Sequence, residues 1–357
     1  MQFVDNFSRM ALISASVILG ALCLSGQVSA QQALADLHRT KAVEDWSTLS
    51  LANSHLQAER PILGEKDDDP QFTRELLQVK WRPGDPIDLY VIKPKGVSKP
   101  PVVLYLYSYP TETDRFRDNR YCARITSGGF AAVGFVSALT GHRYHDRPMK
   151  QWFVSELQEA LGSSVHDVQM ILNYLGSRDD LDLNSVGIFG EGSGGTIAIL
   201  AAAADTRIKA IDLLDPWGDW PDWMASSGII PDEERSNFQK PEFLAKVAPL
   251  DPVVWLPQLR SQHIRIQELK SDAVTPKTAK EKIDSASPAS AQLARYDGDL
   301  QLYAASSGGR LFQWIKDQLR SGKETQPAAA TLEKSQSPEK PAPRASAIDG
   351  NARDNQR

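Results

Sequence analysis

Residues 185–200 read "SVGIFGEGSGGTIAIL", and this stretch decides the fold. A short apolar run stops in a glycine-rich segment around Ser193, and small, helix-compatible residues follow it. This order is typical of a strand, a sharp turn and a helix. Any chemistry at such a turn depends on the residue at its tip, so the spacing of the neighbouring residues has to identify that residue.

Segments on both sides of the turn alternate between strand-like and helix-like patterns. Residues 72–94 predict a hairpin, because two alternating apolar runs flank the turn signal "RPGDP". Later strand-like runs are "PVVLYLYSY", "GFAAVGFVSA", "IKAIDLLDP" and "HIRIQEL", and helix-like runs are "SSVHDVQMILNYLGSR" and "GGRLFQWIKDQL". The alternation predicts an α/β domain over residues 72–320, with a mainly parallel central sheet flanked by helices.

Composition favours a globular protein with a substantial core. The chain has 357 residues, of which 41% are hydrophobic and 24% charged, with a formal net charge of -5. It has no basic surface of the kind that tracks phosphate backbones, so we expect no nucleic-acid partner.

The first thirty residues predict a signal peptide. Arg9 leads into the apolar stretch "ALISASVILGALCLSG", and "QVSA" offers a cleavage site before Gln31. The stretch is shorter than a membrane span needs, so we expect export to the periplasm or the medium without a stable membrane anchor. Cleavage leaves Cys122 as the single cysteine, which predicts no internal disulfide, and nothing in the sequence indicates a metal site or a cofactor.

Three further segments have distinct compositions. Residues 31–71 are polar with scattered apolar positions, which predicts one or two surface helices ending near Pro61. Residues 215–258 lack a strand pattern and predict a lid-like insertion. Residues 321–357 are rich in Pro, Ala, Ser, Glu and Lys, which predicts a disordered tail.

Three motifs carry a resemblance to a known family: "SRDDLDLNSVGIFGEGSGG", "TGHRYHDRP" and "LKSDAVTP". On these motifs the chain resembles the α/β-hydrolase superfamily, especially dienelactone hydrolases, acyl esterases and prolyl-oligopeptidase-like catalytic domains. The resemblance covers about residues 72–320. It implies the α/β-hydrolase fold, with a nucleophile elbow in the first motif and the catalytic acid in the third.

The elbow can be aligned in two ways. The family pattern of glycine, any residue, nucleophile, any residue, glycine, glycine falls on Gly190, Glu191, Gly192, Ser193, Gly194 and Gly195, which puts Gly192 at the nucleophile position. A shift by one residue puts Ser193 there but places Glu191 where the family needs glycine. We favour Gly192, because the glycine constraints are steric, whereas a serine beside a glycine is common in loops.

The remaining catalytic positions are also incomplete. The resemblance assigns the acid to Asp272, which as a residue type equally suits a turn-capping aspartate. No histidine follows it; Asp297 and Asp299 stand near the position where the family has its histidine. His142 and His145 are the candidates for a relocated base, since triads are defined by geometry and not by chain order.

Two other sets of residues belong to the candidate site. The resemblance places the oxyanion loop at Ser108 and Tyr109, whose backbone N–H groups can donate. Trp217, Trp220 and Trp223 alternate with aspartates, a pattern that suits either a ligand pocket or a lid packing its own core.

Two functions follow from these observations. The first is an exported hydrolase-fold protein that has lost its nucleophile and histidine and keeps a pocket for a small-molecule ligand or a partner. The second is an active serine hydrolase for ester or peptide substrates, using Ser193, Asp272 and His142 or His145. The absence of a histidine after the acid favours the first.

Overall fold

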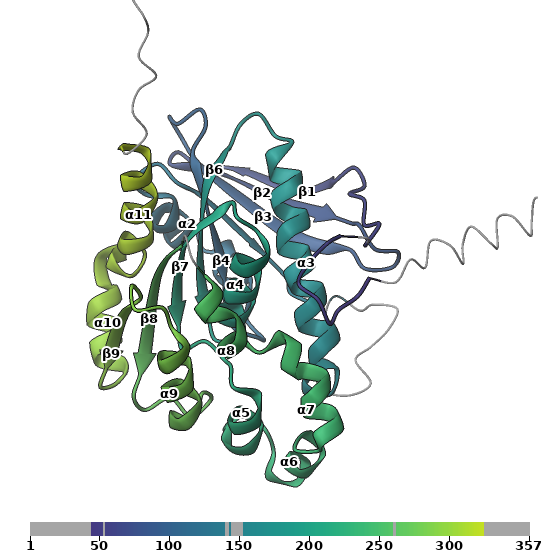
Figure 1. Cartoon of the computed structure of the whole chain (residues 1–357). Coiled ribbons are helices and arrows are strands. Elements are labelled where there is room, and N and C mark those ends of the chain that lie inside the picture. Colours follow the sequence, from purple (N-terminus) through teal and green to yellow (C-terminus); the bar gives the residue numbers. More distant parts are fainter. Residues whose placement is uncertain (1–43, 53, 140–142, 144–152, 260–261, 325–357) are drawn as a thin grey trace, which may run out of the picture.

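A single mixed sheet organises the chain. The structure, a computed structural model, describes residues 44–52, 54–139, 143, 153–259 and 262–324. Within them the sheet has nine strands in the order β1-β2-β3-β5-β4-β6-β7-β8-β9 (Figure 1). The pairs among β1, β2, β3 and β5 are antiparallel, and every pair from β5 to β9 is parallel. The predicted mainly parallel sheet is confirmed.

The elements have the following bounds. The strands are β1 Ile62–Asp68, β2 Phe72–Val79, β3 Ile87–Pro94, β4 Pro101–Leu106, β5 Ala131–Phe135, β6 Asp182–Glu191, β7 Ile208–Leu214, β8 His263–Leu269 and β9 Gln292–Tyr296. The helices are α2 Asn119–Thr126, α3 Leu157–Gly176, α4 Ser193–Ala204, α5 Trp220–Ser226, α6 Asp232–Phe238, α7 Pro241–Val247, α8 Pro252–Trp255, α9 Lys277–Ala286, α10 Asp299–Ser306 and α11 Gln313–Glu324. No helix of the described residues is long and apolar enough to cross a membrane.

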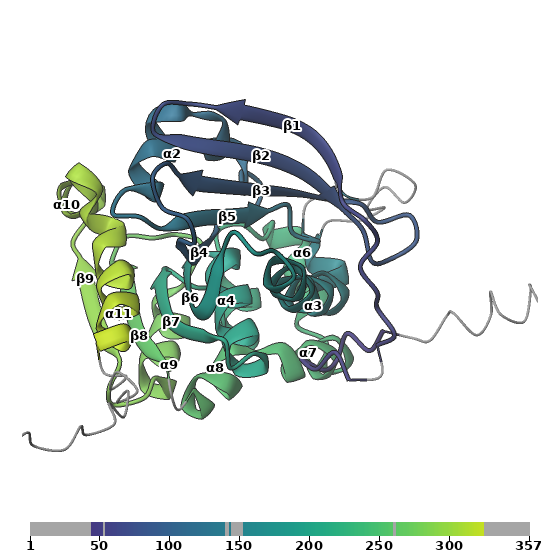
Figure 2. The same ribbon diagram turned by 90° about the horizontal axis from the view of Figure 1, so that it is seen from above.

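Helices cover both faces of the sheet (Figure 2). Helices α3 and α4 pack on one face, where α4 is apolar all round and buried over most of its length. Helices α2 and α11 pack on the other face; in α11, Ile315 and Leu319 are buried. A parallel sheet buried on both faces explains why β4 and β6 read as continuous apolar runs.

The N-terminal segment differs from its predicted helices. Residues 44–52 and 54–61 contain no helix, and Ile62–Asp68 forms edge strand β1, which pairs with β2. Five of the seven residues of β1 are polar or glycine, and the strand is mostly exposed. The sequence therefore has no alternation of apolar residues that would predict this strand. The helical prediction is wrong for these described residues, and residues 31–43 lie outside them.

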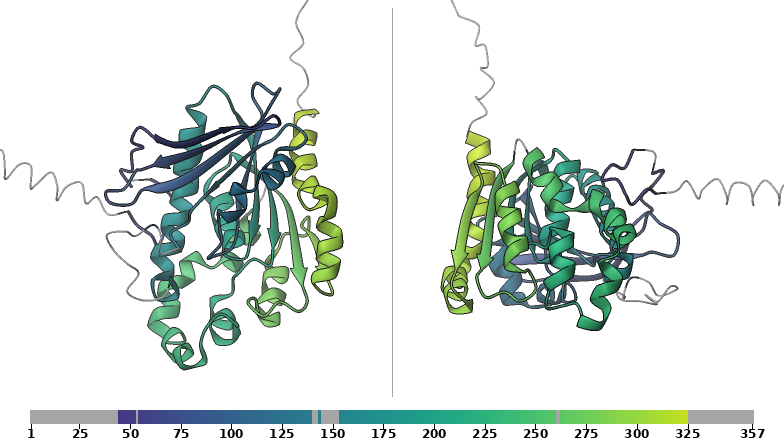
Figure 3. Two further views of the ribbon diagram at one scale, coloured as in Figure 1. Left: turned by 180° about the vertical axis from the view of Figure 1, so that it is seen from behind. Right: turned by 60° about the horizontal axis from the view of Figure 1, so that its bottom comes forward.

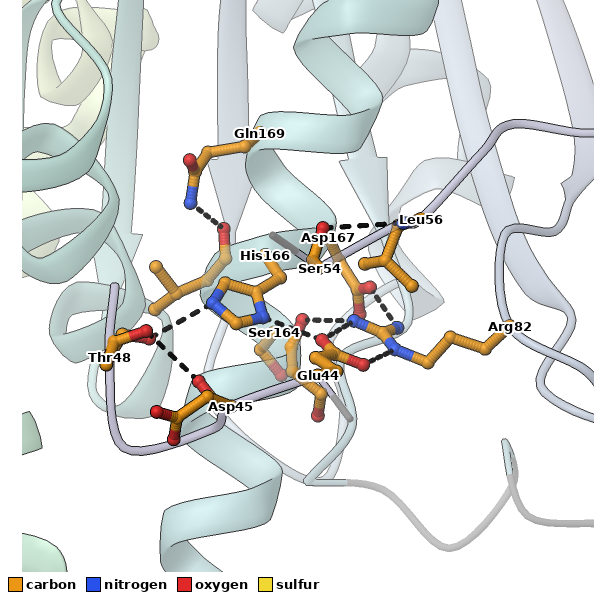
Figure 4. Close-up of polar contacts among 12 residues, drawn as sticks. Glu44, Asp45, Thr48, Ser54, Leu56, Arg82, Ser164, His166, Asp167 and Gln169 are labelled. Atoms are coloured by element: carbon orange, nitrogen blue, oxygen red, sulfur yellow. Dashed lines mark hydrogen bonds and ion pairs between the residues drawn. The ribbon is translucent and has the colours of Figure 1, made fainter. Parts of the chain in front are cut away.

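A buried network of ion pairs and hydrogen bonds connects residues 44–49 to the core (Figure 4). The Glu44 carboxylate accepts hydrogen bonds from Arg82 and lies 2.7 Å from Nδ1 of His166. Asp167, also on α3, is fully buried and accepts from the guanidinium groups of Arg82 and Arg143. Arg143 in addition forms a bidentate pair with Asp85, at 3.0 and 2.7 Å.

The segment between β7 and β8 is helical. It forms the short helices α5 to α8, of which α8 packs against α4, while α5, α6 and α7 extend from the body of the sheet (Figures 1 and 3). The C-terminal helix runs to Glu324, four residues into the segment that the sequence predicts as a tail. The predicted signal peptide and residues 325–357 lie outside the described residues.

Candidate functional site

The turn between β6 and α4 places Gly192 at its tip. Strand β6 ends at Glu191 and α4 begins at Ser193, and Gly192 between them has φ 54° and ψ −118°. This φ lies in the left-handed region that glycine adopts without the steric cost of a Cβ. The Gly192 N–H donates to the carbonyl of Leu214 at 2.9 Å, which ties the tip to the end of β7. Ser193 is thus the first helical residue.

Close backbone packing explains the glycines around the tip. A Cβ added at Gly194 would overlap the carbonyl oxygen of Leu106 at the end of β4, and one at Gly190 would lie 2.6 Å from the carbonyl oxygen of Gly194. Neither position has space for a side chain. A third glycine, Gly195, faces Pro216. The turn therefore has the tight strand-to-helix geometry that the sequence pattern predicts.

The side chain of Ser108 occupies the space in front of the tip. A Cβ added at Gly192 would overlap Ser108 Oγ and lie 2.9 Å from Ser108 Cβ and 3.1 Å from Nε1 of Trp217. The place into which a nucleophile at position 192 would project is thus filled by a hydroxyl from another loop. Sequence reasoning missed this contact, because residues 108 and 192 are far apart in the chain.

The backbone donors of the oxyanion loop bond to the chain itself. Tyr109 N–H donates to Ser193 Oγ at 2.9 Å, and Ser193 N–H donates to Ser108 Oγ at 3.5 Å. Ser193 is fully buried. The resemblance places the Tyr109 N–H in the oxyanion loop, and the Ser193 N–H follows the tip, where an elbow supplies its own donor. Each of these two groups already has a serine hydroxyl as its acceptor.

Asp272, the predicted acid, caps its own turn after β8. Its Oδ1 accepts from Val274 N–H at 3.0 Å and its Oδ2 from Thr275 N–H at 2.9 Å. A cation also faces it, since Lys280 Nζ on α9 lies 3.7 Å from Oδ2. Both carboxylate oxygens are engaged, in the arrangement expected of a turn-capping aspartate.

Lys280 neutralises a second acid beside Asp272. Its ammonium donates to Asp215 Oδ1 at 2.6 Å and to the carbonyl of Leu269, and Lys280 and Asp215 are both buried. Burial raises the pKa of Asp215, against the hydrogen bond from Lys280, and the nearby Asp272 raises it further. The ends of β7 and β8 thus carry two carboxylates around one lysine where a triad needs a carboxylate facing an imidazole.

The loop after β9 carries aspartates and no histidine. Asp297 is exposed, pairs with Lys270 and accepts from Gln301 Nε2 at 3.0 Å; the Lys270 bond lowers its pKa. Asp299 begins α10.

Histidines among the described residues stand elsewhere. His166 belongs to the network of Figure 4, and His263 begins β8, at the end of the strand opposite to Asp272. His55 is exposed in the N-terminal segment. His142 and His145 lie outside the described residues.

A cavity of about 360 Å³ lies beside the loop that follows β8 and carries Asp272. Its lining is Glu268, Leu269, Lys270, Thr275, Lys277, Lys280, Glu281, Asp284 and Arg295. Burial and the nearby Asp284 carboxylate raise the pKa of Glu268 to about 7. The side chains of its lining carry charges of both signs.

The tryptophans of the insertion are core residues. Trp217, Trp220 and Trp223 are at most 2% exposed and pack on one another, with ring centroids 5.1 and 5.8 Å apart in the two pairs that include Trp223. This is the arrangement of a lid that packs its own core rather than of a ligand pocket. Among the described residues no three His, Cys, Asp or Glu side chains gather as a metal ion requires.

Solved structures share the fold at low sequence identity. No family model matches the sequence, and no curated protein does. An S-formylglutathione hydrolase from Agrobacterium tumefaciens is 15% identical with a TM-score of 0.54, covering 72% of this chain and 99% of that one.

Two acetyl xylan esterases are similar in the same way. That from Paenibacillus sp. R4 is 16% identical with a TM-score of 0.53, covering 73% of this chain and 89% of its own. That from Thermoanaerobacterium sp. JW/SL YS485 is 14% identical with a TM-score of 0.52, covering 72% and 88%. At these identities the likeness concerns the fold alone, which is the α/β-hydrolase fold.

Proposed function

We propose that this chain, with its α/β-hydrolase fold, performs no acyl transfer and acts as an exported binding protein for a small molecule or a partner. The observation that carries the proposal is the exchange of hydrogen bonds among Ser108, Tyr109 and Ser193. It fills the tip of the elbow and occupies the two N–H groups that an oxyanion would need.

Acyl transfer requires donors that are free when charge develops on the substrate oxygen. Preorganised N–H groups are effective because they need no rearrangement at the moment of reaction. Here a substrate carbonyl would first have to displace the Ser193 hydroxyl from Tyr109 N–H and move Ser108. The buried hydroxyl of Ser193 would then need a new acceptor or donor, which costs free energy.

Proton transfer lacks a partner as well. A serine nucleophile needs an imidazole that takes its proton and a carboxylate that orients the imidazole. Asp272 spends its oxygens on Val274 N–H and Thr275 N–H and faces Lys280. Among the described residues no imidazole bonds to this carboxylate, and His142 and His145 lie outside those residues.

Export rests on the sequence of residues 1–30, which lie outside the described residues. We propose cleavage before Gln31 and delivery to the periplasm or the medium. N-terminal sequencing of the protein from fractionated cells tests this: a mature chain beginning at Gln31 supports export, and a full-length chain in the cytoplasmic fraction contradicts it.

An activated phosphonate probe tests the loss of catalysis. We expect the purified mature protein to remain unlabelled, hydrolysis of short acyl esters to stay at background, and Ser193→Ala to leave both results unchanged. Stoichiometric labelling of Ser193 that is abolished by His142→Ala or His145→Ala would overturn the proposal. It would establish the alternative, a serine hydrolase with Ser193, Asp272 and a relocated histidine.

A further inference from the structure

A second pocket lies beside the elbow, on the side of α2. It has a volume of about 510 Å³ and is lined by Arg115, Asp118, Arg120, Tyr121 and Arg124. Arg115 Nη2 lies 3.6 Å from Glu191 Oε2, and Glu191 is the last residue of β6. The pocket is therefore close to the C-terminal ends of the parallel strands, where open α/β sheets bind ligands.

The positive charges of the three pocket arginines are not compensated by hydrogen bonds to the surrounding carboxylates. Asp118 spends Oδ1 on the first turn of α2, where it accepts from Arg120 N–H at 2.7 Å and Tyr121 N–H at 3.2 Å. Glu191 is too far from Arg115 for a hydrogen bond. Among the described residues, no carboxylate accepts a hydrogen bond from the guanidinium groups of these arginines. This is a local excess of positive charge on a chain of net charge -5.

Aromatic rings support two of the guanidinium groups. Cζ of Arg115 lies 4.4 Å from the centroid of the Tyr107 ring, and Cζ of Arg124 lies 5.3 Å from that of Tyr121. The hydroxyls of the two tyrosines bond to each other, and both residues are buried. Stacking on a fixed ring restricts a guanidinium while its N–H edge can still donate. The two rings thus orient the donors before a ligand arrives.

We propose that this pocket binds a tetrahedral oxyanion carried by a phosphorylated or sulfated small molecule. Guanidinium forks match phosphate and sulfate oxygens in pairs, and several of them around one concave site suit a group with more than one negative charge. The volume is within the range of small-molecule sites. The inference rests on the proposed binding role and deepens it by naming the chemistry of the ligand.

The charge of Glu191, an elbow residue, should affect how tightly the pocket binds an anion. An anion that draws Arg115 into the pocket competes with the Glu191 carboxylate for the same guanidinium. Burial raises the pKa of Glu191, and the proximity of Arg115 lowers it. Removal of the Glu191 charge should therefore strengthen anion binding, an effect opposite in sign to the loss of an arginine.

The test is calorimetric titration of the mature protein with inorganic phosphate and inorganic sulfate at pH 8 and constant ionic strength in chloride. We expect the double variant Arg120→Ala, Arg124→Ala to bind about tenfold or more weakly, and Glu191→Gln to bind more tightly. Arg117→Ala is the matched control, because Arg117 is an exposed arginine of the same segment that does not line the pocket. It should bind as the wild type does.

The outcomes separate the sources of the anion and the two proposals. Tighter binding of phosphate indicates a phosphate ester and tighter binding of sulfate a sulfate ester, and either supports the site. Failure of both anions to bind, or an equal loss in Arg117→Ala and the double variant, overturns it. If the phosphonate probe leaves the protein unlabelled and no anion binds, the proposed loss of catalysis stands and the anion site is refuted. If the probe labels the protein and an anion binds, the anion site stands and the loss of catalysis is refuted.

Discussion

Two groups of arginines in this molecule differ in how their charge is compensated. Arg82 and Arg143, in the interior beneath the N-terminal segment, each bond to two or more carboxylates (Figure 4 shows Arg82). Arg115 and Arg124, beside the elbow, rest on aromatic rings; Arg115 has one carboxylate, that of Glu191, at 3.6 Å, and Arg124 pairs with no described carboxylate. The first group is paired because a buried charge without a partner costs several kcal/mol, whereas an exposed one costs little.

The difference separates structural charge from charge available to a ligand. Pairing in the interior leaves Arg82 and Arg143 no capacity to bind anything else. The protein stays folded when an exposed arginine has no ion-pair partner. The stability of the fold therefore does not explain why these arginines lie together in one pocket. Variants that remove one charge from each group can break or sharpen this contrast.

The largest effect is expected for Asp167→Asn. Asp167 is fully buried and bonds to two guanidinium groups, so loss of its charge removes one compensating carboxylate from each of two buried arginines. We expect the free energy of unfolding, measured with urea, to fall by about 3 to 5 kcal/mol. Asp317→Asn on α11 is the control, since Asp317 pairs with Arg320 at the surface and should contribute less than about 1 kcal/mol. A fall below about 1 kcal/mol for Asp167→Asn would refute the structural role.

A buried acid in the same region, Glu112, should give a pH dependence. Burial raises the pKa of Glu112 to about 7, although the bonds from Ser137 lower it. A folded-state pKa above the unfolded value stabilises the protein at pH below about 4.5, and this stability is lost as pH rises to about 7. The loss is about 3 kcal/mol.

Glu112→Gln removes this titration. The difference between variant and wild type in the free energy of unfolding should therefore change by about 3 kcal/mol between pH 4 and pH 8, in favour of the variant at the higher pH. Urea unfolding at several pH values measures it. Parallel curves for the two proteins would show that Glu112 titrates normally.

Gly192→Ser should destabilise the fold without creating an enzyme. The new Cβ would meet Ser108 Oγ, and the φ of 54° disfavours any residue but glycine. We expect a loss of about 1 to 3 kcal/mol, part of which Ser108→Gly in the double variant should restore by removing the clash. Esterase activity above background in either variant would contradict the proposed lack of a base.

The smallest effect is expected for Arg124→Ala in the pocket. Its guanidinium stacks on Tyr121 and forms no ion pair with a described acid, so thermal or urea unfolding should change by about 0.5 kcal/mol or less. A loss comparable with that of Asp167→Asn would show that the pocket arginines are structural after all.

Local patterns in the sequence predicted most of the fold. The alternating runs of 72–94 became β2 and β3, the apolar runs around Gly187 and Ile211 became adjacent parallel strands, and the C-terminal amphipathic segment became α11. Edge strands β1 and β9 were missed, since exposed strands carry little apolar alternation. The turn at Gly192 was predictable because the spacing of its glycines is a pattern within six consecutive residues.

The contacts that define the site were not predictable. Ser108 reaches the elbow from another loop, and Lys280 reaches Asp215 across the ends of two strands. Neither pairing leaves a pattern at short sequence separation. The same holds for the network of Asp167, whose partners Arg82 and Arg143 lie on different segments. Residue types indicated which groups were present, and only the fold specified which groups met.

Cys122 gives the molecule an internal reporter of local opening. Its side chain is fully buried on α2, its Sγ donates to the carbonyl of Phe116 at 3.1 Å, and burial raises its pKa. Thiol reagents attack an accessible thiolate, so they can react only when this helix detaches from the sheet. In a chain that begins at Gln31, where Cys122 is the single cysteine, the reaction rate relative to a free thiol measures the free energy of that detachment, and an anion held by the arginines of the same helix should slow it.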